Sequence, residues 1–344
     1  MPIADIASDR RWELYKLLGE PIRLRLLALS AVEELAIGEL AELCGESQPN
    51  VSRHLKPLRR AGLLVERKEG TRVYVRLDEA RGLDPVIEDA LRTGHELIAA
   101  DGSAARVAEI IAARELPSQD FFERGHADLA QYPSELSAYL SALRPLMGRL
   151  QNAALAVDAG CGNGAMLEVI APIFEKVLAF DRSEAQVGLA RQRMSGSGYS
   201  HVQTMVATLG DASVEQKVHE LGGADVVFAA RLLHHASRPA KAIRDLSALV
   251  APGGALVVVD YAAHHDETMQ REQADIWLGF NADELVRFSE EAGLEDASVQ
   301  RVPSLRCGNG PDGHLDWLTL CASKTASASK TARIGKRRPS RHTN

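Results

Sequence analysis

Hydrophobic spacing divides the chain into two parts of different character. Between residues 10 and 114, leucines and other apolar residues recur at three- and four-residue intervals, the spacing of amphipathic helices. Beyond residue 150, short apolar runs such as LAVDA (155–159) and LVVVD (256–260) alternate with helical stretches, which is typical of strands in a parallel sheet. The pattern therefore predicts a mainly helical N-terminal part and an α/β C-terminal part.

The N-terminal part begins with helices on either side of a break at Gly19 and Pro21. A short third helix is expected to end at Gly45, a suitable C-cap residue. Ser47 is a good N-cap for the next helix, and Pro49 is tolerated in its first turn. Two helices joined by a tight turn that contains glycine form a helix-turn-helix.

The second helix of this pair carries the candidate chemistry for DNA. Val51, Leu55 and Leu58 form its inward stripe, so the polar side chains between them face outward. Amide side chains pair with adenine, arginine pairs with guanine, and serine reaches bases or phosphates. Such residues also serve solubility alone, so this face does not decide the function by itself. The candidate DNA contacts here are Ser47, Gln48, Asn50, Ser52, Arg53, His54 and Lys56.

The segment after this helix favours DNA binding over mere solubility. Residues 63–77, LLVERKEGTRVYVRL, alternate between apolar and polar positions around a turn at Glu69 and Gly70. A hairpin that follows a recognition helix makes a winged helix, in which Lys68 and Arg72 would contact phosphate or the minor groove. From Arg53 to Arg76 the sequence carries eight basic and two acidic residues, a local net charge of +6.

Residues 10 to 80, and above all the run SQPNVSRHLKPLRRAGLL (47–64), resemble the ArsR/SmtB family of bacterial winged-helix repressors. The resemblance implies a homodimer that binds double-stranded DNA at an inverted-repeat operator. Metal-sensing members carry a cysteine pair just before the helix-turn-helix, where this chain has LAIGEL (35–40), and Cys44 has no neighbouring cysteine. Soft-metal sensing needs several converging thiolates or imidazoles, so we expect no metal and a different effector.

The connecting region is expected to be helical. Residues 85–114 are rich in alanine and periodic, with a break at Asp101-Gly102-Ser103, and further helices are predicted up to Met147. In the resembled family, the helix after the wing packs against the first helix of a second subunit. The resemblance therefore implies a dimer seam, and an intramolecular bridge is the alternative.

The C-terminal part opens with a glycine-rich turn, VDAGCGNG (157–164), directly after a buried strand. Glycines at such a turn let backbone N–H groups approach a ligand at the start of a helix. The next strand, KVLAFD, ends at Asp181, 17 residues after Gly164, where an acid can accept hydrogen bonds from ribose hydroxyls. Taken alone, the turn fits both a nicotinamide-dependent enzyme and a methyltransferase.

The wider set VDAGCGNG, AFDRSEAQVGLARQR, LGD, LLHH and LVAPGGALVVVD resembles class I S-adenosylmethionine-dependent methyltransferases over residues 118 to 322. The resemblance implies a seven-stranded sheet with helices on both faces. It also implies that Asp181 holds the ribose, Arg182 lies beside the adenine, Asp211 meets the adenine amino group, and Arg231 and His234 border the ligand. The cradle of the methionine part would be Asp158, Gly160, Cys161, Gly162, Asn163 and Gly164.

No catalytic base stands out. Methyl transfer from a sulfonium depends largely on positioning, so an enzyme needs no obvious base, and the weak candidates are His234, His235, Tyr261 and His264. His234 and His235 are equally well read as a hydrogen-bonded loop pair. The run HHDE (264–267) is not expected to bind a metal, because four adjacent positions cannot converge on one ion in regular structure. The run WLGF (277–280) is expected to pack over the sheet, although its two aromatics could roof a substrate pocket.

Composition limits the cellular setting. The chain has 344 residues, a formal net charge of −7, and four cysteines without a CxxC pair. A disulfide framework or zinc ribbon is not expected from such spacing. No apolar run approaches the ~20 residues that cross a bilayer, and no secretion signal is visible, so a cytoplasmic protein without membrane contact is expected.

These observations predict an α/β protein with an α+β N-terminal domain: a winged helix-turn-helix followed by a Rossmann-like, seven-stranded methyltransferase domain. The expected function is an ArsR-type transcriptional regulator, a repressor, with S-adenosylmethionine or S-adenosylhomocysteine as its effector. One alternative is an active methyltransferase of an unidentified small molecule whose winged helix regulates its own operon. A nicotinamide-linked enzyme with a DNA-binding appendage is a third reading. The expected boundaries are 1–82 for the winged helix, 83–147 for a helical dimerisation or linker region, 148–322 for the methyltransferase domain, and 323–344 for a disordered basic tail.

Overall fold

A computed structural model describes residues 6–78, 84–123, 154–304 and 310–326, together with Tyr139, Leu140, Leu143 and Leu146. Most of the helices expected between 124 and 147, and residues 327–344 of the expected basic tail (323–344), lie outside the described residues. The chain divides into two compact units. The winged-helix unit comprises Met1–Phe121, His234–Pro239 and His264–Leu278, and the sheet unit comprises Phe122–Leu233, Ala240–Ala263 and Gly279–Asn344.

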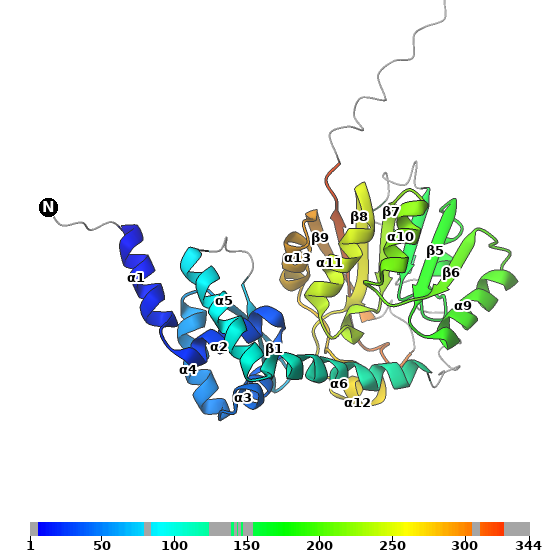
Figure 1. The fold of residues 1–344 in the computed structure, drawn as a ribbon. Helices are drawn as coiled ribbons and strands as arrows, with labels where there is room; N and C mark the ends of the chain where they lie inside the picture. The colour runs from blue at the N-terminus through cyan, green and yellow to red at the C-terminus, as the bar shows by residue number, and fades with distance from the viewer. Residues whose placement is uncertain are drawn as a thin grey trace, which may run out of the picture. The chain divides into compact units, whose positions relative to one another are not determined.

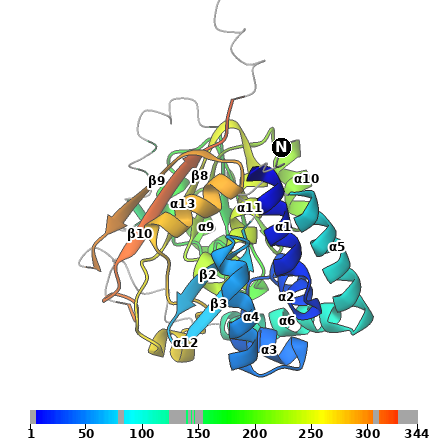
Figure 2. The ribbon, with the colours of Figure 1, turned by 90° about the vertical axis from the view of Figure 1, so that its left-hand side faces the viewer.

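The winged-helix unit contains the predicted helix-turn-helix and hairpin in the predicted order, together with the unpredicted elements β1 and α12 (Figures 1 and 2). Its three strands form an antiparallel sheet in the order β1-β3-β2, in which Glu69 pairs with Arg72 at the tip of the wing. The elements are α1 (Ile6–Leu18), α2 (Pro21–Val32), β1 (Leu35–Ala36), α3 (Ile37–Cys44), α4 (Gln48–Arg60), β2 (Leu64–Glu69), β3 (Arg72–Leu77), α5 (Pro85–Ala100), α6 (Ser103–Glu123) and, from the later segment, α12 (Thr268–Glu272).

Local sequence signals account for the start and position of the recognition helix α4. Gly45 ends α3 in the left-handed conformation with φ of 68°, which glycine adopts without a steric cost. The Ser47 side chain accepts a hydrogen bond from Asn50 N at 3.4 Å and so caps α4, as predicted. Val51, Leu55 and Leu58 are fully buried, which confirms the predicted inward stripe.

Helices α2 and α5 approach each other closely at one glycine. A Cβ atom on Gly94 would lie 2.4 Å from the backbone oxygen of Leu24 and 2.8 Å from the Cβ of Ala28. Any larger side chain would therefore separate the two helices. Around this contact, leucines of α2 such as Leu26, Leu27 and Leu29 form the centre of the unit's hydrophobic core.

The sheet unit contains the predicted seven-stranded sheet (Figure 1). Five parallel strands are continued by β10, which runs antiparallel to both β8 and β9, and the order is β6-β5-β4-β7-β8-β10-β9. This result confirms the Rossmann-like class. The strands are β4 (Leu155–Ala159), β5 (Lys176–Asp181), β6 (Val202–Val206), β7 (Ala224–Ala230), β8 (Val250–Tyr261), β9 (Glu295–Val302) and β10 (Trp317–Ser323).

Helices connect these strands. Helix α9 packs on β5 and β6, and α13 packs on β9 and β10. The helical elements are α8 (Leu167–Ile170), α9 (Glu184–Gly196), α10 (Ala212–Glu220), the short 3₁₀ helix η4 (Leu233–His235), α11 (Pro239–Leu249) and α13 (Ala282–Glu291). Among all the helices described, none is both long and apolar enough to traverse a bilayer.

Two local expectations differ from the structure. The helix predicted after the glycine-rich turn is reduced to the single turn of α8. Pro252, Gly253 and Gly254, a combination typical of a turn, lie instead within β8, where the pairing with β7 shifts register. Gly254 permits this shift, because a Cβ there would lie 2.8 Å from the backbone oxygen of Asp225.

Candidate functional site

Helix α4 presents the predicted polar face. Ser47, Gln48, Ser52, Arg53 and Lys56 are exposed. Between them, Asn50 donates from Nδ2 to Glu46 Oε2 at 2.6 Å and accepts at Oδ1 from the Arg53 guanidinium at 2.6 Å. The side chains are therefore partly ordered by one another at the helix surface.

His54 is the member of this predicted set that points least toward solvent. Its side chain is 12% exposed, and its Nδ1 lies 3.2 Å from Glu20 Oε2 in the residue that precedes α2. The contact ties the recognition helix to α2, so His54 has a packing role beside the DNA contact predicted for it.

The wing separates its basic residues into two groups. Lys68 and Arg72 are exposed, as a phosphate-contacting role requires. Arg67 and Arg76 are buried, and Arg67 lies 3.2 Å from Glu34 Oε1 and 3.6 Å from Glu69 Oε2. The charge counted from the sequence therefore overstates the positive charge that the wing offers to DNA.

The buried arginine of the wing stacks on a distant tryptophan. The guanidinium carbon of Arg67 lies 3.6 Å from the ring centroid of Trp277, and Tyr74 meets the same indole edge-on at 4.7 Å. Leu278 N donates a hydrogen bond to Glu69 Oε1. Trp277 was expected to pack over the sheet, but it packs on the wing, because a buried guanidinium is stabilised over an indole face.

A second segment from the C-terminal part joins the same unit. Trp277 Nε1 donates to Ala236 O at 2.6 Å, Arg238 forms an ion pair with Glu33, and Ser237 Oγ donates to Glu115. Burial raises the pKa of Glu33 to about 7, and the charge of Arg238 opposes that rise. Contacts of this kind explain why His234–Pro239 and His264–Leu278 belong to the winged-helix unit, whereas the sequence assigned both to the methyltransferase domain.

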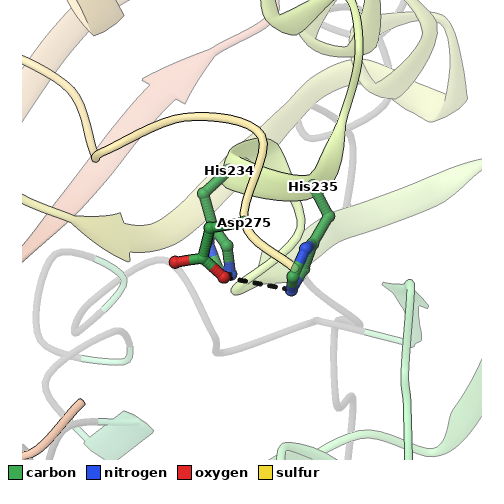
Figure 3. Close-up of side chains that lie close together, drawn as sticks. All are labelled: His234, His235 and Asp275. Atoms are coloured by element: carbon green, nitrogen blue, oxygen red, sulfur yellow. Dashed lines mark ion pairs between the residues drawn. The ribbon is translucent and has the colours of Figure 1, made fainter. Parts of the chain in front are cut away.

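The two adjacent histidines lie beside an aspartate that sequence reasoning missed (Figure 3). His234 is fully buried, and its Nε2 lies 3.7 Å from Asp275 Oδ1. The Nε2 of His235 lies 3.9 Å from the same oxygen. No periodic pattern in the sequence connects Asp275 with the histidines, so only the tertiary structure reveals this cluster.

The glycine-rich turn after β4 is held by backbone contacts to the end of β5. Gly160 N and Cys161 N both donate to Phe180 O, at 2.9 and 3.0 Å, and Gly162 N donates to Asp181 Oδ2 at 2.9 Å. Gly164 has φ of 84°, and a Cβ on it would lie 3.0 Å from the Cα of Ala190. The turn therefore requires glycine both for its backbone conformation and for close packing.

The carboxylate of Asp158, in β4 just before this turn, is a buried polar group without a hydrogen-bond partner in the described part of the chain. The residue is 1% exposed, and neither carboxylate oxygen has a hydrogen-bond partner among the described residues. Burial, with a smaller contribution from the charge of Asp181, raises the pKa of Asp158 to about 7. A buried acceptor of this kind is suited to a ligand that brings its own donor or positive charge.

Asp181 lies at the end of β5, where the sequence placed the ribose. Its Oδ1 accepts from Ser183 N at 2.9 Å, and each of its oxygens retains a second lone pair for a ribose hydroxyl. Burial raises its pKa, whereas the backbone N–H groups of Ser183 and Gly162, and then the charge of Arg182, oppose the rise. Asp211, the candidate for the adenine, is exposed at the start of α10 and accepts from Thr208 N at 2.8 Å.

Two other predicted members of the turn have mainly local contacts. The Oδ1 of Asn163 accepts from Ala165 N at 3.2 Å and so stabilises the turn itself. Burial raises the pKa of the Cys161 thiol well above its usual range, which makes this cysteine unreactive.

Arg231, predicted to border the ligand, belongs to a polar triad. Its guanidinium lies 2.9 Å from the Tyr261 hydroxyl and 3.1 Å from Asp312 Oδ2, and the hydroxyl donates to that same carboxylate at 2.9 Å. Arg231 also has φ of 56°, an uncommon conformation for a residue other than glycine. Asp312 was not predicted, because it lies in a loop without a recognisable motif.

The remaining catalytic candidates are also engaged. Tyr261 is fully buried, and His264 Nδ1 accepts from Asp266 N at 3.2 Å in a local turn. The ligand roles of the proposed site residues stay predictions.

Comparisons with known proteins find a separate match for each part of the chain. Residues 18–67 match the family described as a helix-turn-helix domain, and residues 157–256 match a family described as a methyltransferase domain. The arsenic resistance transcriptional regulator ArsR1 of Pseudomonas putida is 36% identical over 100 residues, which cover 28% of this chain and 77% of that protein. The HTH-type transcriptional regulator KmtR of Mycobacterium tuberculosis is 34% identical over 83 residues, or 24% of this chain.

The matched region spans 64% of the length of KmtR. Among solved structures, the N-methyltransferase NodS of Bradyrhizobium japonicum in complex with S-adenosyl-L-homocysteine aligns over 61% of this chain and 98% of its own, with 18% identity and a TM-score of 0.45.

Proposed function

Because this chain belongs to the ArsR family of helix-turn-helix transcriptional regulators and carries a methyltransferase domain, we propose that it is a DNA-binding repressor controlled by S-adenosylmethionine or S-adenosylhomocysteine. In this proposal the methyltransferase-fold domain serves as the sensor, and bound ligand changes the affinity of the winged helix for its operator.

The observation that carries the sensor half is the buried carboxylate of Asp158. Its two oxygens have no hydrogen-bond partner among the described residues, and it lies directly before the glycine turn. The ammonium group of the ligand's methionine part would supply the missing donor, while Asp181 would hold the ribose. Both ligands carry these groups. S-adenosylmethionine would in addition bring an electrophilic methyl group on a sulfonium.

The two C-terminal segments that belong to the winged-helix unit support the proposal that ligand binding controls DNA binding. The chain leaves the parallel sheet at the end of β7 and of β8, at Ala230 and Tyr261, and shortly afterwards enters the winged-helix unit. The carboxyl ends of parallel strands are where open α/β sheets bind ligands. A ligand that repositions either connection would therefore act on Trp277 and, through it, on Arg67 of the wing. This path from the ligand site to the wing is separate from the covalent connection through the helices that begin at Pro85.

The DNA half of the proposal rests on α4 and the wing. The exposed side chains of α4 would read the major groove, and Lys68 and Arg72 would contact phosphate. We further propose a homodimer on an inverted repeat. Trp12 and Tyr15 support it, because both are 58% exposed on α1, the helix that the family resemblance places at the dimer seam.

The alternative, an active methyltransferase, receives less support from the candidate bases. Tyr261 and His234 are fully buried, and the hydroxyl of Tyr261 is bound to Asp312. His235 lies beside the Asp275 carboxylate. A sensor does not need any of these side chains to reach a substrate.

The test is an operator titration of the full chain without ligand, with saturating S-adenosylmethionine, and with saturating S-adenosylhomocysteine. The operator is first obtained by selection from random duplexes. We expect at least one ligand to change operator affinity by about 5- to 150-fold, the usual range of allosteric coupling, and operator DNA to change ligand affinity by the same factor.

Asp181→Ala should remove this response by weakening both ligands about 10- to 150-fold, the cost of one lost charged hydrogen-bond partner. The matched control is Asp283→Ala, an exposed aspartate in the first turn of α13. Equal operator affinity in all three ligand conditions would contradict the sensor and favour an enzyme tethered to DNA.

A further inference from the structure

We propose that His234, His235 and Asp275 form a binding site for one divalent transition-metal ion, with Zn²⁺ as the best-suited ion (Figure 3). The expectation from the sequence was that the chain holds no metal. That expectation rested on the cysteines and on the run 264–267. Asp275 is distant in sequence from His234 and His235, and only the tertiary structure brings the three together.

The spacing of the three side chains fits a shared ion. One ligand atom from each residue lies within 4.8 Å of the other two, and the carboxylate oxygen is 3.7 and 3.9 Å from the two Nε2 atoms. A direct N–H···O hydrogen bond would bring these atoms to about 2.7–3.2 Å. Ligand atoms bound at about 2.1 Å around a tetrahedral ion stand about 3.4 Å apart, close to the two separations measured from the carboxylate oxygen.

The orientation of His235 matches that of a metal ligand. Its Nδ1 lies 3.3 Å from the backbone oxygen of Ala274, so Nδ1 carries the hydrogen in that contact. In the neutral ring, Nε2 then presents a lone pair toward the carboxylate of Asp275. A cation between Nε2 and the carboxylate would bind both, and a carbonyl bound to the far nitrogen is the usual outer partner of a histidine ligand.

Burial favours a held ion over solvent. The side chains of His234 and Asp275 are each 1% exposed, and that of His235 is 12% exposed. An ionised carboxylate at this depth is costly unless a positive charge compensates it. Two imidazoles and one carboxylate form a borderline donor set that suits zinc and its neighbours in the first transition series, and not magnesium or calcium.

The site would fasten two stretches of chain to each other. His234 and His235 belong to the connection after β7, whereas Asp275 precedes Trp277 in the segment after β8. These stretches already meet through Ile276 N and Trp277 N, which donate to His234 O at 2.8 and 3.1 Å. A bound ion would therefore stabilise the position of Trp277 against Arg67 of the wing.

The experiment uses the full untagged chain, stripped with a chelator under reducing conditions and titrated with Co²⁺ and then Zn²⁺. We expect one equivalent of Co²⁺ to give the visible d–d absorption of a tetrahedral N/O site, and Zn²⁺ to displace it. Asp275→Asn and His235→Ala should each weaken binding by at least about 10-fold, since loss of even an outer partner of a zinc ligand costs 10- to 100-fold.

The matched control is His265→Ala, which removes an exposed histidine from the same segment and should leave Co²⁺ binding unchanged. His235→Ala is the variant least expected to misfold, because this side chain is the least buried of the three. Circular dichroism shows whether the variant is folded. Absence of the Co²⁺ band in the wild type, or an equal band in Asp275→Asn, would overturn the site and would indicate a protonated imidazole instead. Neither readout involves DNA or S-adenosylmethionine, so the result is independent of the proposed function.

Discussion

At the scale of single residues, the most informative group is the carboxyl of Asp158. Burial raises its pKa to about 7, so near neutral pH the ligand-free protein contains both its protonated and its ionised form. The unfolded chain would ionise near the ordinary aspartate pKa, about 3.9. The native state therefore binds more protons between these two values, and the stability that depends on Asp158 falls as pH rises through this window and is constant above it.

A bound ammonium group reverses this preference, because it favours the ionised carboxylate. Affinity for S-adenosylhomocysteine should consequently fall as pH drops below 7, by up to about eightfold between pH 7.5 and pH 6.0 if only the ionised form binds. Calorimetric titration at several pH values measures this dependence. Asp158→Asn should flatten it, and an unchanged pH dependence in that variant would show that another group is responsible.

At the scale of elements, sequence patterns work where neighbouring residues determine the structure. The cap at Ser47, the buried stripe of α4 and the strand from Lys176 to Asp181 were all predicted, because each depends on local conformation or on a short apolar run. The segment His264–Leu278 was not placed correctly, since its partners Arg67 and Tyr74 lie far away in the chain. No periodicity encodes such a pairing.

The α2–α5 contact gives a prediction about stability. Gly94→Ala should destabilise the winged-helix unit by about 1–3 kcal/mol, the usual cost of overpacking, because its Cβ would meet the backbone oxygen of Leu24 at 2.4 Å. Hydrogen exchange of α2 and α5, resolved by mass spectrometry, measures the change. Gly188→Ala is the matched control: it lies within α9 with no heavy atom within 4 Å of its new Cβ and should stabilise by about 0.5–1 kcal/mol. Equal effects of the two substitutions would refute the tight contact.

At the scale of the whole molecule, the proposed repressor requires a second copy of the chain. Trp12→Glu should weaken dimerisation by about 30-fold or more, because a central tryptophan in an interface typically contributes at least 2 kcal/mol. Sedimentation velocity measures the dimer, and operator affinity should fall with it. Ile173→Glu, at an exposed apolar residue of the sheet unit, is the control and should leave the dimer intact. A wild-type monomer, or equal weakening by both substitutions, would argue against α1 as the seam.

The participation of His234–Pro239 and His264–Leu278 in the winged-helix unit has a consequence for the history of the gene. When two fused domains fold independently, a single split of the gene between them can yield two functional proteins. Here a break after Glu123 would release a DNA-binding fragment in which Arg67 no longer has the indole of Trp277 above it and Glu33 no longer has Arg238. Since removing one partner of a buried charge is strongly destabilising, such a fragment would be selected against. With these loops in the N-terminal core, a separation of the two parts of the gene would therefore carry a cost in stability.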